Sequence, residues 1–186
     1  LVSWSVGGVF LGLGGAIAGD LLGRSDYLVT AVVVASLQAA AAVAQLVWNL
    51  RSGPADWRWG IAVGVGFMVA GLGAASLSLE VGTVAGFTAA TAGAGVGMGL
   101  LFLMGTTLVA QSAPSAERGR VFSALYVVAY LALGVPAVVA ALVAEQIGII
   151  PAFHLMAVVV GLIAVTALVS VVRRRGAGGL GGAGSR

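Results

Sequence analysis

Long apolar runs separated by short polar segments make up most of this chain. Runs of about 20 residues match the length that an α-helix needs to cross a bilayer. The polar residues do not alternate with apolar ones as they do in barrel strands, and open sheet edges cannot face lipid. The pattern therefore predicts an all-α membrane protein whose six transmembrane helices cover residues 2–18, 27–48, 59–79, 83–110, 121–144 and 151–172.

The composition supports the same class. Charged residues make up 8% of the chain and hydrophobic residues 60%, with a mean hydropathy of +1.12. A typical soluble domain has about 25% charged residues, so this chain has too few charges to cover a water-facing surface. It also has no cysteine, which excludes disulfides and thiolate metal sites.

The arginines indicate the orientation. If the six spans alternate in direction, most arginines and all four tryptophans fall on one side of the membrane. By the positive-inside rule and the interfacial preference of tryptophan, that side is cytoplasmic. We therefore expect a multi-pass plasma-membrane protein with both ends of this chain in the cytoplasm and a disordered Arg/Gly-rich tail at 173–186. The residues on this side are Trp4, Trp48, Arg51, Trp57, Arg58, Trp59, Arg118, Arg120, Arg173, Arg174, Arg175 and Arg186.

Polar residues inside the spans are the first candidates for function, because they need partners or water in a bilayer. In the second span, Gln38, Gln45 and Asn49 form one stripe on a helix; they either line a substrate path or bond a neighbouring helix. In the fifth span, a second stripe either lines the same path or anchors the helix at the interface. Thr106 in the fourth span either joins the path or bonds its own backbone. The second stripe consists of Ser123, Tyr126, Tyr130 and Gly134.

Small residues and proline are the candidates for packing or hinge roles. In the fourth span Gly93 and Gly97 form one small-xxx-small pair, and Gly95 and Gly99 form another on nearly the opposite face. Neighbouring helices can therefore approach this span closely on two sides. In the fifth span Gly134 and Pro136 weaken the helix, because proline removes one backbone hydrogen bond.

The remaining ionisable residues do not suggest an enzyme. Glu80, Glu145 and the single histidine, His154, fall at span ends, where solvation or a scaffold position is the simplest role. We find no nucleophile motif, no clustered metal ligands and no phosphate-binding loop, since the chain contains no lysine. No cofactor, metal ion or nucleic-acid partner is expected.

The second half of the chain resembles the major facilitator superfamily of transporters. Pro114 and the Arg118-Gly119 pair precede an apolar helix containing "LGVPAVVAALVAEQIG", which "PAFHLMAVVVGLIAV" follows. These segments look like helices eleven and twelve of that family, and "GAGVGMGLLFLMGTTLVAQSAP" is similar to helix ten. The loop "RSGPADWRWG" has Gly53, Asp56 and Arg58 of the family's gating loop but lacks its basic pair.

This resemblance implies a C-terminal six-helix half, built as a 3+3 inverted repeat, of a carrier that works by alternating access. It also implies an N-terminal half upstream of this fragment, a small-molecule substrate, and a proton as a candidate coupling ion. Gating or hinge roles would fall to Gly53, Asp56, Arg58, Gly95, Gly99, Arg118, Gly134 and Pro136. The apolar and aromatic lining favours export of amphipathic drug-like or metabolite molecules. The alternative is a non-transporting six-helix scaffold or assembly partner in the bilayer.

Overall fold

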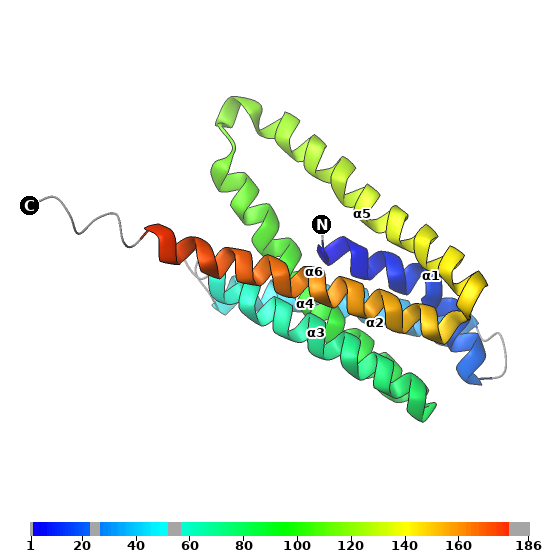
Figure 1. The fold of residues 1–186 in the computed structure, drawn as a ribbon. Helices are drawn as coiled ribbons and strands as arrows, with labels where there is room; N and C mark the ends of the chain where they lie inside the picture. The colour runs from blue at the N-terminus through cyan, green and yellow to red at the C-terminus, as the bar shows by residue number, and fades with distance from the viewer. Residues whose placement is uncertain (1, 23–26, 52–56, 179–186) are drawn as a thin grey trace, which may run out of the picture.

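The computed structural model describes residues 2–22, 27–51 and 57–178, and within these residues every regular element is helical (Figure 1). A short 3₁₀ turn, η2 (Ser115–Glu117), links the fourth and fifth helices. The six α-helices are α1 (Val2–Leu22), α2 (Tyr27–Arg51), α3 (Trp57–Val81), α4 (Val84–Ser112), α5 (Arg118–Ile147) and α6 (Ile149–Gly178).

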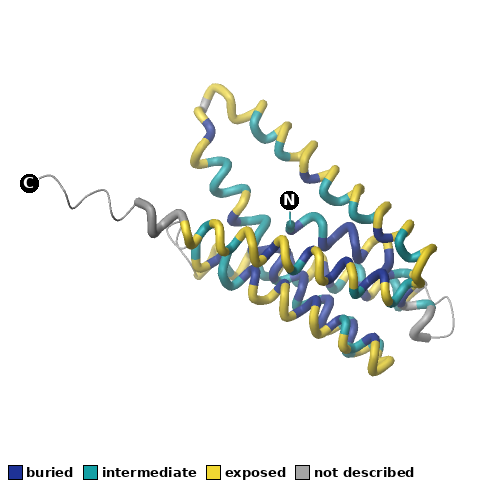
Figure 2. The backbone as a smooth tube through the Cα atoms, viewed as in Figure 1, coloured by how far each residue is buried: buried dark blue, intermediate teal, exposed yellow. Residues whose placement is uncertain are grey.

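Five of these helices, α2 to α6, are long and apolar enough to cross a bilayer. In α1, the apolar helical stretch Val2–Ile17 is shorter than these. Many large apolar residues are exposed, above all on α5, and Figure 2 shows exposed residues along the length of that helix. An apolar outer surface is unfavourable in water and suits a hydrocarbon environment. The prediction of a helical, multi-pass membrane protein is therefore confirmed at this level.

The helix boundaries follow from local backbone chemistry. Gly82 lies between α3 and α4 with φ of 72°, and Gly148 separates α5 from α6 with φ of 93°. Glycine tolerates these left-handed conformations because it has no Cβ. The α4 helix ends at Ser112, just before Pro114 and two residues beyond the end expected for the fourth span. The α6 helix continues to Gly178, six residues beyond the end expected for the sixth span, and the rest of the tail lies outside the described residues.

Helix α4 lies at the centre of the bundle; α2 and α3 pack along it, and α1 packs against α5. The α3 and α6 helices also pack on each other. Three rings from three helices, Phe10, Phe87 and Phe153, meet in the core with centroids 5.5 to 6.0 Å apart. Such aromatic pairs contribute about 0.5–1.5 kcal/mol each beyond the area that they bury.

The two ends of the bundle differ in charge. The end of α2, the start of α3, the α4–α5 connection, the start of α1 and the end of α6 lie at one end of the bundle (Figure 1). That end carries all the arginines whose side chains the structure describes: Arg51, Arg58, Arg118, Arg120 and Arg173. The other end carries the described side chains of Glu80, Glu145 and His154. This grouping matches the one expected from alternating spans.

Candidate functional site

Helices α2 and α4 cross at close range because α4 presents glycine. A Cβ added to Gly95 would collide with the carbonyl oxygen of Leu37, and one added to Gly99 with that of Ala41. On the other side of α4, a Cβ on Gly97 would lie 2.5 Å from the Gly64 carbonyl oxygen of α3. Both faces of α4 therefore pack closely on neighbours, as the spacing of the glycines predicts. Gly95 and Gly99 lie within continuous helix.

Helices α1 and α5 cross in the same way, which we did not predict. A Cβ on Gly8 would collide with the carbonyl oxygen of Leu133, and one on Gly12 would lie 3.0 Å from that of Ala137. Both crossings join a Gly-xxx-Gly pair to two positions four residues apart on a helix that runs in the same direction. The pair in α1 has the spacing that marks such contacts. The sequence does not say which helix it meets.

The polar stripe of α2 lies beside this crossing. Gln38 directly follows Leu37, so it points about 100° around the helix from the packed position. Gln38 and Asn49 are exposed and Gln45 is partly exposed. Among the described residues, none of the three donates or accepts a side-chain hydrogen bond, so the alternative of bonding a neighbouring helix within this chain is not realised.

The polar stripe of α5 occupies the equivalent flank. Gly134 directly follows Leu133, just as Gln38 follows Leu37, and a Cβ added to Gly134 would meet no atom within 4 Å. Ser123, Tyr126 and Tyr130 are exposed, the last with 63% of its surface accessible. The helix continues through Pro136. The α2 stripe thus begins, and the α5 stripe ends, one residue beyond a packed position, in the same rotational sense.

A small cavity of about 70 Å³ lies between α1, α4 and α5 at the arginine-bearing end. Ser3, Trp4, Phe102 and Thr106 help to line it. The Trp4 ring lies 5.5 Å from Phe102 and 5.9 Å from Tyr130, and its buried indole Nε1 has no hydrogen-bond partner. From their connection at this end α4 and α5 diverge (Figure 1), and the two helices make few contacts with each other.

The structure brings some of the predicted site residues together and leaves others apart. Tyr130 and Thr106 both lie near Trp4, although the Thr106 hydroxyl donates to the backbone oxygens of Phe102 and Leu103 at 3.0 Å each. The α2 stripe lies on a helix that makes no extensive contact with α5. Sequence reasoning missed Ser3 and Trp4 as cavity residues, although Trp4 was expected at this interface.

The predicted gating residues are only partly described. Gly53 and Asp56 lie outside the described residues. The Arg58 guanidinium lies 4.9 Å from the centroid of the Trp57 ring, which is a cation–π contact. Arg118 is exposed and begins α5. Their proposed gating roles stay predictions.

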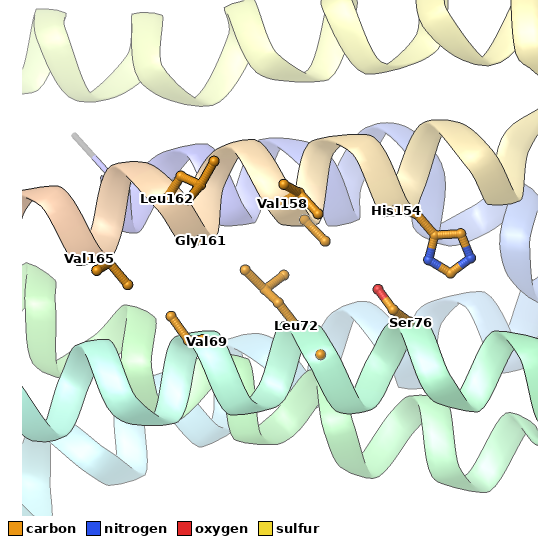
Figure 3. Close-up of a pocket in the computed structure, with 10 residues that line it drawn as sticks. Val69, Leu72, Ser76, His154, Val158, Gly161, Leu162 and Val165 are labelled. Carbon is orange, nitrogen blue, oxygen red and sulfur yellow. The ribbon is translucent and has the colours of Figure 1, made fainter.

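The opposite end contains an ion pair that we did not predict. His154 Nε2 lies 2.9 Å from Glu80 Oε1, joining α6 to α3. We expected simple solvation of Glu80 and a scaffold position for His154; Glu80 is 67% exposed but also pairs with the histidine. The two residues are 74 positions apart, so no local pattern could have linked them. His154 closes one end of a groove between α3 and α6 (Figure 3).

Within the described residues, no three His, Asp or Glu side chains come close enough together to share a metal ion. Comparison of the chain with models of protein families, with curated proteins and with solved structures found no match. Hypotheses about function therefore rest on the residues and their geometry.

Proposed function

We propose that this bundle is one half of a secondary transporter of the major facilitator type and moves small amphipathic molecules by alternating access. It works against a second six-helix bundle, and the substrate passes between the two. In this plasma-membrane carrier, the arginine-bearing end faces the cytoplasm. Helix α1 crosses the membrane as well, which brings the number of spans to six. The activity is transport rather than enzymatic catalysis. Carriers of this type place their substrate site near the bilayer midplane, between structural repeats.

The two glycine crossings support an internal 3+3 repeat. Under that repeat α1 corresponds to α4 and α2 to α5, so the contact of α1 with α5 corresponds to that of α4 with α2. The residue pairs agree with this correspondence. In the sequence numbering, Gly8 is as far from Gly95 as Gly12 is from Gly99. In the same way, Leu37 is as far from Leu133 as Ala41 is from Ala137.

The observation that carries the proposal is the pair of unpartnered polar stripes. In a bilayer, an amide or hydroxyl on a helix needs protein or water beside it. Within the described part of this chain, neither the Gln38 amide nor the Tyr130 hydroxyl has a hydrogen-bond partner, and both residues are exposed. A second bundle with a water-filled path between the halves would satisfy both, because the stripes occupy equivalent flanks under the repeat.

The chemistry of these surfaces indicates the class of substrate. The stripes offer amides, phenols and a hydroxyl, and the nearby cavity adds the indole donor of Trp4. No described arginine lies at mid-span, where it could bind an anionic group. Amphipathic molecules with aromatic or cationic parts fit this lining better than sugars or phosphates do, and export is the proposed direction.

The test is accumulation of a fluorescent lipophilic cation, such as ethidium, in cells that produce the intact protein. We expect Gln38→Leu and Tyr130→Leu to reduce export about two- to tenfold, which corresponds to one hydrogen bond. Gln146→Leu is the matched control, because Gln146 lies on a different face near the end of α5. Normal export by both stripe variants at equal membrane levels would refute the proposed path. No export by the wild-type protein across a panel of such cations would favour the scaffold alternative.

A further inference from the structure

The groove between α3 and α6 is a site that the proposed transport path does not use. It encloses about 440 Å³, within the range of about 300–1,000 Å³ typical of small-molecule pockets. Its walls are apolar, with Leu72 and Val69 on α3 facing Val158 and Leu162 on α6 (Figure 3). The groove therefore suits a hydrocarbon chain.

Two glycines give the groove its depth. Gly73 on α3 and Gly161 on α6 both line it, and a Cβ added to either would meet no atom within 4 Å. These glycines do not bring the helices into contact, unlike those of α4. They leave space where a side chain would otherwise lie.

The groove is about as long as one leaflet is thick. Along α6 it extends from His154 to Val165, which is about 16 Å at the helical rise of 1.5 Å per residue. The hydrocarbon core of a bilayer is about 30 Å thick, so one leaflet contributes about half of that. His154 lies near the start of its membrane-spanning helix and Val165 near the middle.

The polar end of the groove has the chemistry of a lipid headgroup site. Ser76 on α3 and His154 on α6 face each other there (Figure 3). The Ser76 hydroxyl makes no hydrogen bond with any other described residue, so it is able to donate to an ester carbonyl. Glu80, on the next turn of α3, holds His154 at 2.9 Å and leaves most of its carboxylate exposed.

The charge at this end favours an amine over an anion. The charged side chains that the structure describes here are those of Glu80 and Glu145, and the described arginine side chains all lie at the opposite end. A carboxylate at the mouth of the groove attracts an ammonium group and repels a headgroup with a net negative charge. An amine-bearing lipid therefore complements the site better than an anionic one.

We propose that this groove binds an acyl chain of a phospholipid of the phosphatidylethanolamine class, taken from the leaflet at the Glu80 end. The chain lies between Gly73 and Gly161, the ammonium group pairs with Glu80, and Ser76 donates to the ester carbonyl. The proposal depends on a bilayer environment and not on the transport function.

The test is native mass spectrometry of the full chain, released from detergent that contains equal amounts of phosphatidylethanolamine and phosphatidylglycerol with identical acyl chains. We expect the wild type to retain the ethanolamine lipid about two- to fivefold better, the range expected of one exposed ion pair. Glu80→Gln should remove this preference. Glu145→Gln is the matched control, because Glu145 lies at the same end outside the groove, and it should leave the preference intact.

Filling the groove tests the acyl-chain part separately. Gly73→Leu and Gly161→Leu, on facing helices, should each reduce retention of both lipids, whereas Gly66→Leu on the exposed surface of α3 outside the groove should not. Equal retention of the two lipids by the wild type would overturn the headgroup assignment. Undiminished retention by both groove-filling variants, with each variant still folded by circular dichroism, would overturn the site.

Discussion

Glycine has opposite roles in two regions of this bundle. At the α2–α4 and α1–α5 crossings, a Cβ on Gly99 or Gly8 would collide with the backbone of the neighbouring helix. In the α3–α6 groove, a Cβ on Gly73 or Gly161 would meet no atom. The residue type is the same and all four positions are helical. What differs is whether the partner helix approaches the missing side chain or stays away from it.

The comparison shows that a small-residue motif does not determine packing by itself. In a bilayer, helices associate through close contact, because lipid tails solvate apolar side chains as well as another helix does. Glycine permits that contact, but the partner must also offer a flat backbone surface. Leu37 and Ala41 on α2 do so for α4. At the groove, Leu72 on α3 and Val158 on α6 line the space between the two helices.

The largest expected effect is that of a bulky residue at a crossing. Gly99→Leu should destabilise the bundle by at least about 1–3 kcal/mol, because the added side chain meets the Ala41 backbone, which cannot move aside. The measurement is the folded fraction during titration with a denaturing detergent. Gly73→Leu is the matched control and should fold normally. Equal stability of the two variants would break the distinction between crossing and groove.

A smaller change at the other crossing tests whether the two crossings are equivalent. Gly8→Ala adds only a methyl group, yet it meets the Leu133 carbonyl oxygen, so the α1–α5 contact must widen. We expect a loss of about 1–3 kcal/mol, similar to that of Gly95→Ala at the α2–α4 crossing, in the same titration. If Gly8→Ala is neutral while Gly95→Ala is destabilising, the two crossings are not equivalent, and the evidence for the repeat is weaker.

The same substitution in the groove should have the opposite sign. Gly161→Ala enters open space and replaces the residue of lowest helix propensity after proline. It should therefore stabilise the bundle by about 0.4–1 kcal/mol, chiefly by restricting the unfolded chain. A rise in the midpoint of the detergent titration is the expected result, whereas a fall would mean that the groove is closed in the folded protein.

The smallest effect concerns the ion pair at the end of the groove. Glu80→Gln should change the stability by less than about 1 kcal/mol, because one partner is largely exposed and such pairs contribute little. The thermal midpoint of the variant in detergent without added lipid measures this. A larger loss of stability would show that α3 and α6 are held together mainly by this pair and not by the packing of their apolar side chains.

Sequence reasoning predicted the helices and their number because the bilayer imposes their length and separates them by charged or glycine-containing links. It also predicted that Gly97 and Gly99 contact different neighbours, since a two-residue step rotates by about 200°. It could not predict which helices meet. Each span is apolar around its whole circumference, so the sequence pattern does not indicate which face of the helix packs against another helix. The α1–α5 crossing and the pair of Glu80 with His154 both depend on that information.

The central claim is that the flanks of α2 and α5 with unpartnered polar residues face a watery path, whereas their apolar faces meet lipid. This chain contributes no cysteine, so a cysteine introduced into it, in a background without other cysteines, can report this directly. The most direct measurement is the reaction rate of Gln38→Cys and Val43→Cys, in the intact protein in membranes, with a charged, membrane-impermeant thiol reagent. Both positions are exposed on α2 near mid-span. The account predicts rapid modification at position 38 and almost none at position 43. Equal protection of both cysteines from the reagent would contradict the claim.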